Sequence, residues 1–342
     1  IINYQIHSYD IQDIEYENEI FQDITLDGEP DFIIQGSPKL PHINRSLIIP
    51  DYNSASISIL AHDYTEHYNM DIVPSKGNPK RNIDINMLPL IKGDSYNEDS
   101  FFPLNIVELN DPYILRDYRG QVVQINPFQY NPVSKVLKIY SNITIRVDFN
   151  GMNSINQFSL RKHSSKLVYD FHNLYMDHFL NYATYQNRYT PIPEDGEMLV
   201  ICYDSFCNET QPFVDWKNQK GIKTILVPKS DAGTNVSSIK NYITNFYNSH
   251  DLTYLLLVGD KNQIPTHESG SGYSSGESDI YYAYISGNDS YPEFFVGRFS
   301  SQNSSHINTE VERSIEYERD PQLNGGWYTK GLMIASNEGA GA

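Results

Sequence analysis

Three carboxylates in the second half of the sequence come after segments that resemble β-strands. Asp260 follows the apolar run 254–258, and Asp279 lies in the polar Gly- and Ser-rich loop beyond it. Glu338 follows a later apolar run at 331–335. Sites in open α/β sheets gather at the carboxyl ends of the strands, so these side chains could serve one reaction. Helix-capping or solvated loop carboxylates would give the same pattern, and spacing alone does not separate the two interpretations.

A turn at residues 286–293 carries oxygen donors of the kind that calcium binds. Asp289 and Glu293 lie close together in a Gly- and Asn-containing turn with free backbone carbonyl groups. Ca²⁺ takes hard oxygen ligands from carboxylates and carbonyls. The turn lacks the EF-hand pattern, so an ordinary Asn-Asp turn remains an alternative.

The cysteines and histidines indicate no nucleophile. Cys202 lies inside the apolar run 198–203, where a cysteine is more often an inert core residue than an activated thiolate. Cys207 has no histidine near it in sequence, and His267 is the one histidine that arguably follows a strand of the second half. A catalytic thiol–imidazole pair within these residues is therefore not indicated. Two cysteines are also too few for a disulfide scaffold, although they do not exclude secretion.

The second half alternates short apolar runs with helical periodicity. This alternation predicts right-handed crossovers and a parallel sheet covered on both faces. Two β-rich runs between residues 280 and 299, separated by the turn 287–289, predict a hairpin. The other expected elements are strands at 198–203, 224–227, 254–258 and 331–335 and helices at 211–220, 236–249 and 306–319.

The first half instead shows the period-two alternation of half-buried strands. It is clearest at 54–60 and 135–147, with Pro, Gly and Asn between the runs, and it favours an antiparallel sandwich. The segment 181–193 between the two halves is polar, aromatic and interrupted by proline, which is typical of a linker. Arg188 within it is expected to be exposed to a protease.

Size and charge restrict the classes of partner. A chain of 342 residues and 39.3 kDa predicts two domains. The formal net charge of -18 argues against binding to nucleic acid or to an anionic membrane surface. No segment is long and apolar enough to cross a bilayer, and the first ten residues lack the pattern of a signal peptide. If the protein is secreted, we expect its signal to have been removed.

Long motifs throughout the sequence resemble one family. Residues 93–103, 111–123 and 129–133 are similar to the prodomain of the arginine-specific gingipains. The start of the gingipain catalytic domain is similar to a second set of segments, at residues 213–219, 252–260, 287–289, 297–299 and 334–336. The resemblance implies an α+β chain of two domains. Residues 1–188 would be an antiparallel β-sandwich prodomain that acts as inhibitor and chaperone, and residues 189–342 the first, truncated part of a caspase-like α/β cysteine peptidase.

The resemblance also implies roles for individual residues. The zymogen would be cut between Arg188 and Tyr189, and Glu338 would orient the catalytic histidine. Calcium would be the cofactor, with Ser286 and Tyr291 contributing backbone oxygens. The full set of calcium positions would be Asp260, Ser286, Asp289, Tyr291 and Glu293. The family's catalytic cysteine and histidine lie downstream of Ala342, so this chain alone is expected to be inactive.

The implied enzyme is secreted or held at a bacterial cell surface, and it cleaves peptides after arginine or possibly lysine. Its prodomain would bind its own catalytic domain through the loop 74–81, where Lys80 and Arg81 are basic. Arg81 could pair bidentately with an acid in the specificity pocket, although an ordinary solvated loop is the alternative. A sortase-like processing peptidase of the same secretion system and a catalytically inactive binding module are the rival functions.

Overall fold

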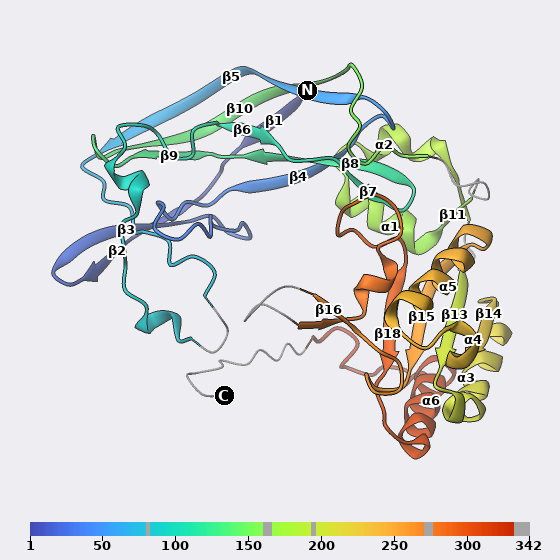
Figure 1. Ribbon diagram of the computed structural model, residues 1–342. Coiled ribbons are helices and arrows are strands. Elements are labelled where there is room, and N and C mark those ends of the chain that lie inside the picture. Colours follow the sequence, from blue (N-terminus) through green and yellow to red (C-terminus); the bar gives the residue numbers. More distant parts are fainter. Residues whose placement is uncertain (80–82, 160–165, 193–195, 270–275, 332–342) are drawn as a thin grey trace. The chain divides into compact units, whose positions relative to one another are not determined.

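The computed structural model describes residues 1–79, 83–159, 166–192, 196–269 and 276–331 (Figure 1). The chain divides into two compact units. Among the described residues, the first comprises Ile1–Pro112 and Gln121–Asn153, and the second comprises Tyr113–Gly120 and the residues from Ser154 onward. Lys80, Arg81, Glu338 and the expected strand beyond Gly331 lie outside the described residues.

The first unit is built from antiparallel sheets. Its longest strands, β5 (Ser54–Tyr68) and β10 (Val136–Asn150), pair along their whole lengths, and β1 (Ile2–Gln5) and β9 (Phe128–Asn131) also pair with β10. A second sheet has the order β4-β8-β6, with β4 at Ile43–Ile48, β8 at Tyr118–Ile125 and β6 at Val107–Leu109. The remaining elements are the hairpin of β2 (Asp10–Tyr16) and β3 (Glu19–Thr25) and the 3₁₀ turns Ile85–Met87 and Asp94–Asn97.

Side chains from both sheets form a common core in this unit. Ile43 of β4 and Ile125 of β8 pack in one cluster with Ile143 and Ile145 of β10. Leu137 and Ile139 of β10 belong to a neighbouring cluster, so β10 buries alternate residues along much of its length. The period-two pattern at 54–60 and 135–147 is therefore confirmed as strand.

The second unit contains a four-stranded parallel sheet in the order β14-β13-β15-β18. These strands span Glu197–Cys202 (β13), Thr224–Pro228 (β14), Leu252–Val258 (β15) and Phe295–Phe299 (β18). The helices that accompany these strands are α3 (Cys207–Lys220), α4 (Lys229–Ala232), α5 (Val236–Ser249) and α6 (Ser304–Arg319). The predicted alternation of parallel strands and helices is confirmed.

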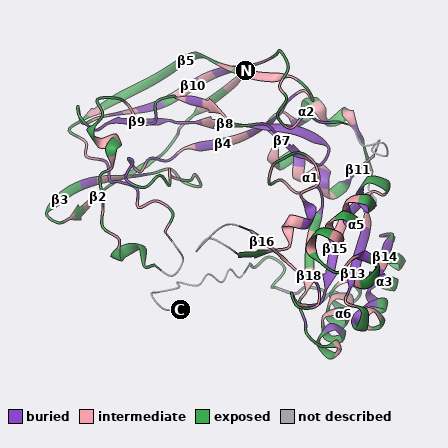
Figure 2. Cartoon of the chain, viewed as in Figure 1, coloured by how far each residue is buried: buried purple, intermediate pink, exposed green. Residues whose placement is uncertain are grey.

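Both faces of this sheet are covered. Leu199 and Ile201 of β13 pack in one cluster with Ile243 of α5, whereas Val200 packs in another with Phe213 of α3 and residues of α6. Figure 2 shows β13 and β15 as mostly buried strands beside helices whose outer faces are exposed. This arrangement explains why the strands are continuous apolar runs.

Local signals set the helix ends. The Asn235 side chain accepts the backbone N–H of Ser238 in a capping box that begins α5. Asn303 caps α6 in the same way through the N–H of His306. Gly221 ends α3 in the left-handed conformation, with a φ of 101°. No helix among the described residues is long and apolar enough to span a membrane.

The predicted hairpin between residues 280 and 299 is wrong. Ile280–Ala283 forms a 3₁₀ turn that buries Tyr282 and Ala283, and β18 pairs in parallel with β15. The segment between them is closed by the Glu293 N–H, which donates to the Ala283 carbonyl at 3.0 Å. Pairing with the buried strand β15 outweighs the local tendency of two β-rich runs to pair with each other.

The second unit also contains elements outside the parallel sheet and its helices. The strand β7 (Tyr113–Leu115) forms a hairpin with the start of β8, and α1 (Tyr169–His178) and α2 (Tyr182–Tyr185) follow later. The short strands β11 (Lys166–Val168) and β12 (Thr190–Ile192) pair in parallel around these helices. The remaining elements are the hairpin of β16 (His267–Ser269) and β17 (Gly276–Ser278) and the 3₁₀ turns Gln186–Arg188 and Asp204–Phe206.

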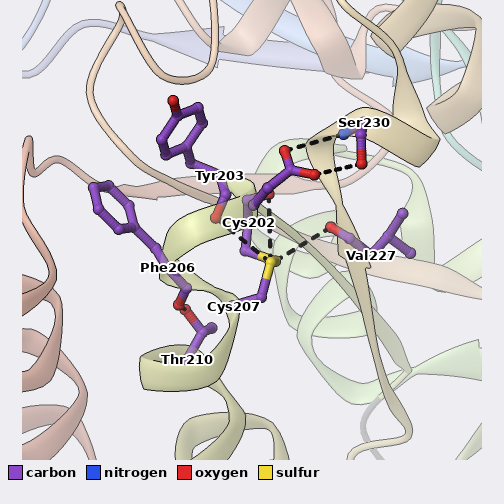
Figure 3. The surroundings of a disulfide bond; sticks show 8 residues. Cys202, Tyr203, Phe206, Cys207, Thr210, Val227 and Ser230 are labelled. Carbon is purple, nitrogen blue, oxygen red and sulfur yellow. Dashed lines mark hydrogen bonds between the residues drawn. A yellow bond between two sulfur atoms is a disulfide. The ribbon is translucent and has the colours of Figure 1, made fainter.

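A disulfide joins the end of β13 to the beginning of α3. Cys202 and Cys207 form this bond, with their Cα atoms 5.3 Å apart (Figure 3). Cys202 is fully buried, and the sulfur atoms lie against the carbonyl groups of Tyr203 and Val227. The expectation that Cys202 is a core residue is confirmed, but its pairing with Cys207 was not predicted. Neither residue is a free thiol.

We expect the Cys202→Ala/Cys207→Ser double variant to lose about 2 kcal/mol of unfolding free energy, because the bond restricts a short loop of the unfolded chain. Urea unfolding of the oxidised chain and of the double variant measures the loss. Thiol titration of the wild-type chain, unfolded without reductant, should detect no free thiol, and two reactive thiols per chain would contradict the disulfide.

Candidate functional site

The loop 284–294, between the 3₁₀ turn and β18, encloses a carboxylate that is fully removed from solvent. Glu293 is 0% exposed, and its Oε2 accepts the backbone N–H of Ile285 at 2.6 Å. Its Oε1 has no hydrogen-bond partner among the described residues. Burial raises the pKa of Glu293 to about 8, although the backbone N–H groups of Ile285 and Ser286 act in the opposite direction. A buried carboxylate with an unsatisfied oxygen is stabilised by a proton or by a cation.

Asp289 has both of its carboxylate oxygens bonded. Oδ1 accepts the N–H of Tyr291 at 3.0 Å, and Oδ2 accepts the N–H of Ile114 at 2.9 Å and the side-chain amide of Asn156 at 3.1 Å. Burial raises the pKa of Asp289, against the lowering effect of the two backbone donors. A Cβ at Gly287, whose φ is +76°, would lie 2.6 Å from the Asp289 Oδ2 atom. The turn therefore requires glycine at this position.

Asp260 occupies the opposite end of β15. Its carboxylate accepts hydrogen bonds from Gln302 at 2.8 Å, from Ser300 at 3.2 Å and from the N–H of Lys261 at 2.8 Å. The bond from Gln302 is the main cause of its lowered pKa. Glu293, by contrast, lies two residues before β18, at the amino end of the sheet. The structure thus brings Asp289 and Glu293 into one loop and separates both of them from Asp260.

Backbone oxygens would have to complete any cation site in this loop. The described residues contain no group of three or more His, Cys, Asp or Glu side chains arranged to hold a metal ion. Ser286 and Tyr291 belong to the same loop as Asp289 and Glu293, and their predicted contribution is through carbonyl groups. The role of these residues in calcium binding remains a prediction.

Asp279 has a structural partner at the carboxyl end of the sheet. Arg298 donates to both of its oxygens, at 2.7 and 2.6 Å. The same guanidinium donates to the carbonyl groups of Gly259 and Ile264 at 2.6 and 3.1 Å. This bidentate pair ties β18 to the chain that leaves β15, which makes the carboxylate a positioning group for the backbone.

His267 packs in an aromatic stack. Its ring lies parallel to that of Tyr281, with centroids 3.6 Å apart, and the ammonium of Lys240 lies 3.6 Å from the centre of the Tyr281 ring. Both cysteines are in the disulfide, so His267 has no thiol partner among the described residues.

The expected processing point, Arg188–Tyr189, is packed against aromatic side chains. The Arg188 guanidinium carbon lies 5.3 Å from the ring centre of Phe158, 5.7 Å from that of Tyr118 and 5.6 Å from that of Tyr189. Tyr189 is only 5% exposed, and its hydroxyl donates to the Asp117 carbonyl at 3.0 Å. Arg188 is therefore half-buried rather than fully exposed. Aromatic surface, rather than water, surrounds much of this side chain.

Sequence reasoning did not identify Arg116, a buried arginine that contacts the loop 284–294. Its side chain is buried, and it donates to the carbonyl groups of Leu252 at 2.6 Å and Glu293 at 2.7 Å. The residue occupies the turn between β7 and β8 with a φ of +48°. A short turn between β-rich runs was the available signal, but nothing local indicates that the arginine points into a core.

Comparison with known proteins assigns the two parts of the sequence. Residues 1–183 match the C25 propeptide family, and residues 192–342 match peptidase family C25. Gingipain R2 of Porphyromonas gingivalis is 36% identical over 344 residues, which are 99% of this chain and 46% of that protein. Gingipain R1 of the same organism is 38% identical over 89% of this chain and 30% of its own length. Lys-gingipain is 24% identical over 97% of this chain and 20% of its own length.

Solved structures of gingipains also align with this chain. The complex of Porphyromonas gingivalis RgpB pro- and mature domains aligns with a TM-score of 0.48 and 32% identity, over 53% of this chain and 90% of that one. The Arg-specific cysteine proteinase gingipain R aligns with a TM-score of 0.35 and 36% identity, over 41% of this chain and 33% of that one. The chain spans about half or less of the length of the curated relatives that it matches. It belongs to peptidase family C25, and it carries the family's propeptide followed by peptidase sequence.

Proposed function

We propose that the protein is the zymogen of a cysteine endopeptidase that cleaves after arginine, with residues 1–188 as the inhibitory propeptide. One observation carries the proposal: the propeptide and peptidase matches meet across residues 183–192, the segment that contains Arg188. Identity to the R gingipains is 36–38%, against 24% to Lys-gingipain, which favours arginine over lysine as the cleaved residue.

The finer fold assignment belongs to the same proposal. The shared core of two antiparallel sheets supports a β-sandwich propeptide. The parallel sheet with helices on both faces supports the start of a caspase-like peptidase domain. The Cys202–Cys207 disulfide favours an oxidising location, as expected of a protein outside the cell or at its surface. Glu338 would orient the catalytic histidine, a role that stays a prediction.

Calcium fits the loop 284–294 on the chemistry of its donors. Glu293 has a buried oxygen without a partner, and Asp289 supplies a second carboxylate nearby. With the carbonyl groups of Ser286 and Tyr291 these residues would form a set of hard oxygen ligands. A bound cation would neutralise the buried charge and fix the loop, which is a structural role. Asp260 would belong to a separate position.

The proposed function is tested with the complete precursor. We expect it to be cut once between the two halves, with Tyr189 as the new amino terminus, and then to hydrolyse arginine amides much faster than lysine amides. Thiol alkylation should abolish the hydrolysis, because the nucleophile is a cysteine. The Arg188→Gln variant should stay uncut and latent. An Arg188→Gln precursor as active as the wild type, or a mature terminus elsewhere, would contradict the assignment.

The packing around Arg188 should slow the cut at this bond. A bond held in a folded segment is cleaved in proportion to the population of its locally open state. Phe158→Ala removes one of the rings that cover the arginine, so trypsin should cut after Arg188 at least about tenfold faster. The matched control is Phe128→Ala, which deletes a fully buried ring from the other unit. Equal rates for wild type and Phe158→Ala would show that the packing does not protect the bond.

Calcium should stabilise the chain through Glu293. At a calcium concentration 100 times the dissociation constant, binding to the folded state alone adds about 2.7 kcal/mol of unfolding free energy. Glu293→Gln should remove most of this gain, since a neutral amide oxygen binds Ca²⁺ more weakly than a carboxylate does. Urea unfolding with calcium and with a chelator measures the difference. Glu277→Gln, at an exposed carboxylate paired with Lys261, is the control and should respond to calcium as the wild type does.

A further inference from the structure

One hairpin of the propeptide lies within the compact unit of the peptidase. Residues Tyr113–Gly120 fall inside the propeptide match, which ends at residue 183, yet they cluster with the unit that contains the parallel sheet. The hairpin consists of β7 and the first residues of β8. The contacts of this hairpin therefore connect propeptide to peptidase sequence within a single packed unit.

Arg116 supplies the central contact. Its guanidinium donates to the carbonyl groups of Leu252 and Glu293, at 2.6 and 2.7 Å, and both acceptors lie in the peptidase match. Its carbon lies 4.5 Å from the ring centre of Phe171, and Asp117 balances the charge at 3.5 Å. Arg116 itself is only 3% exposed. Buried arginines with paired acceptors and an aromatic support are typical of the residues that dominate binding energy at interfaces.

Further contacts fix the hairpin on the same loop. The N–H of Ile114 donates to Asp289 at 2.9 Å. The ring of Tyr113 stacks on that of Tyr291, with centroids 3.7 Å apart and planes inclined by 12°. Arg116 holds a left-handed φ that is uncommon for a residue with a side chain. A strained turn kept in place by polar and aromatic contacts indicates that those contacts matter to the assembly.

The hairpin contacts lie away from the edge where catalysis is expected. Leu252 is the first residue of β15, and Glu293 lies just before β18, so both acceptors are at the amino end of the parallel sheet. Catalytic groups of such sheets lie at the carboxyl ends of the strands. The hairpin thus attaches to a surface distinct from the one that would bind substrate.

We propose that the Arg116 hairpin is the attachment point that keeps the propeptide on the peptidase after the chain is cut at Arg188. The hairpin provides affinity at the amino end of the sheet. The inhibition predicted for Lys80 and Arg81, which lie outside the described residues, is a separate property. This inference rests on the proposed zymogen function, and it adds the residues that hold the two cut pieces together.

The experiment measures how fast the cut propeptide leaves the peptidase. The complete precursor is cut between its halves, and dissociation of the propeptide is followed after dilution by size-exclusion chromatography and by surface capture of the peptidase part. Arg116→Met, which removes the charge and both donated bonds, should dissociate about 100-fold faster than the wild type. Arg116→Lys keeps the charge but not the planar group on Phe171, so its rate should fall between the two.

Two further variants separate attachment from general effects. Arg45→Met removes a propeptide arginine whose partners, Glu29 and Tyr4, lie in the first unit, and it should dissociate as the wild type does. Arg81→Ala should leave the propeptide attached while relieving inhibition. A cut Arg116→Met complex that persists as long as the wild type would overturn the inference. Release of inhibition by Arg116→Met without dissociation would overturn it as well.

Hydrogen exchange on the wild-type complex covers the case in which Arg116→Met does not fold. The amide of Ile114, which donates to Asp289, should stay protected after the cut and exchange only as the propeptide leaves. Rapid exchange of Ile114 in a complex that remains associated would refute the attachment role. An engineered cleavage site for an unrelated protease allows all these measurements even if the natural cut or arginine-directed hydrolysis fails. The two proposals can thus fail independently.

Discussion

The burial of β13 and β15 on both faces is the constraint on which the second unit depends. The central residues of these strands are mostly apolar, because helices cover one side through Ile243 and the other through Phe213. Polar groups are consequently displaced to the two ends of the sheet. Asp260 and the Asp279–Arg298 pair gather at the carboxyl end, whereas Glu293 and the acceptors of Arg116 gather at the amino end. The polar side chains around this sheet are therefore divided between its two ends.

The compact unit that contains the parallel sheet does not begin where the propeptide match ends. The family matches change between residues 183 and 192, but the packed unit already includes the β7–β8 hairpin and all described residues from Ser154 onward. The contacts of Arg116 contribute to this difference. The buried Arg116 guanidinium donates hydrogen bonds to two carbonyl groups of the peptidase sequence. Separating them would cost free energy, because each polar group would then need water or another hydrogen-bond partner.

Short-range sequence patterns predicted much of the fold but less of the candidate site. Period-two runs located β5 and β10, and apolar runs between helical segments located the parallel sheet, because both patterns follow directly from which faces are buried. The error at 280–299 arose from a partner, β15, about 40 residues away. The burial of Arg116, the Cys202–Cys207 pairing and the covering of Arg188 likewise depend on contacts that spacing does not encode. The sequence predicted the loop that contains Asp289 and Glu293. It did not indicate that one carboxylate oxygen of Glu293 lacks a hydrogen-bond partner among the described residues.

The disulfide also bears on the order in which the chain can assemble. Its two cysteines are five positions apart, so their encounter needs almost no long-range organisation, unlike the pairing of β15 with β18. Contacts of low sequence separation form early, because little chain entropy is lost in closing them. In an oxidising environment the corner between β13 and α3 can therefore be set before the neighbouring strands arrive. A disulfide formed this early would hold the end of β13 next to the start of α3 while the other strands of the sheet pair with β13.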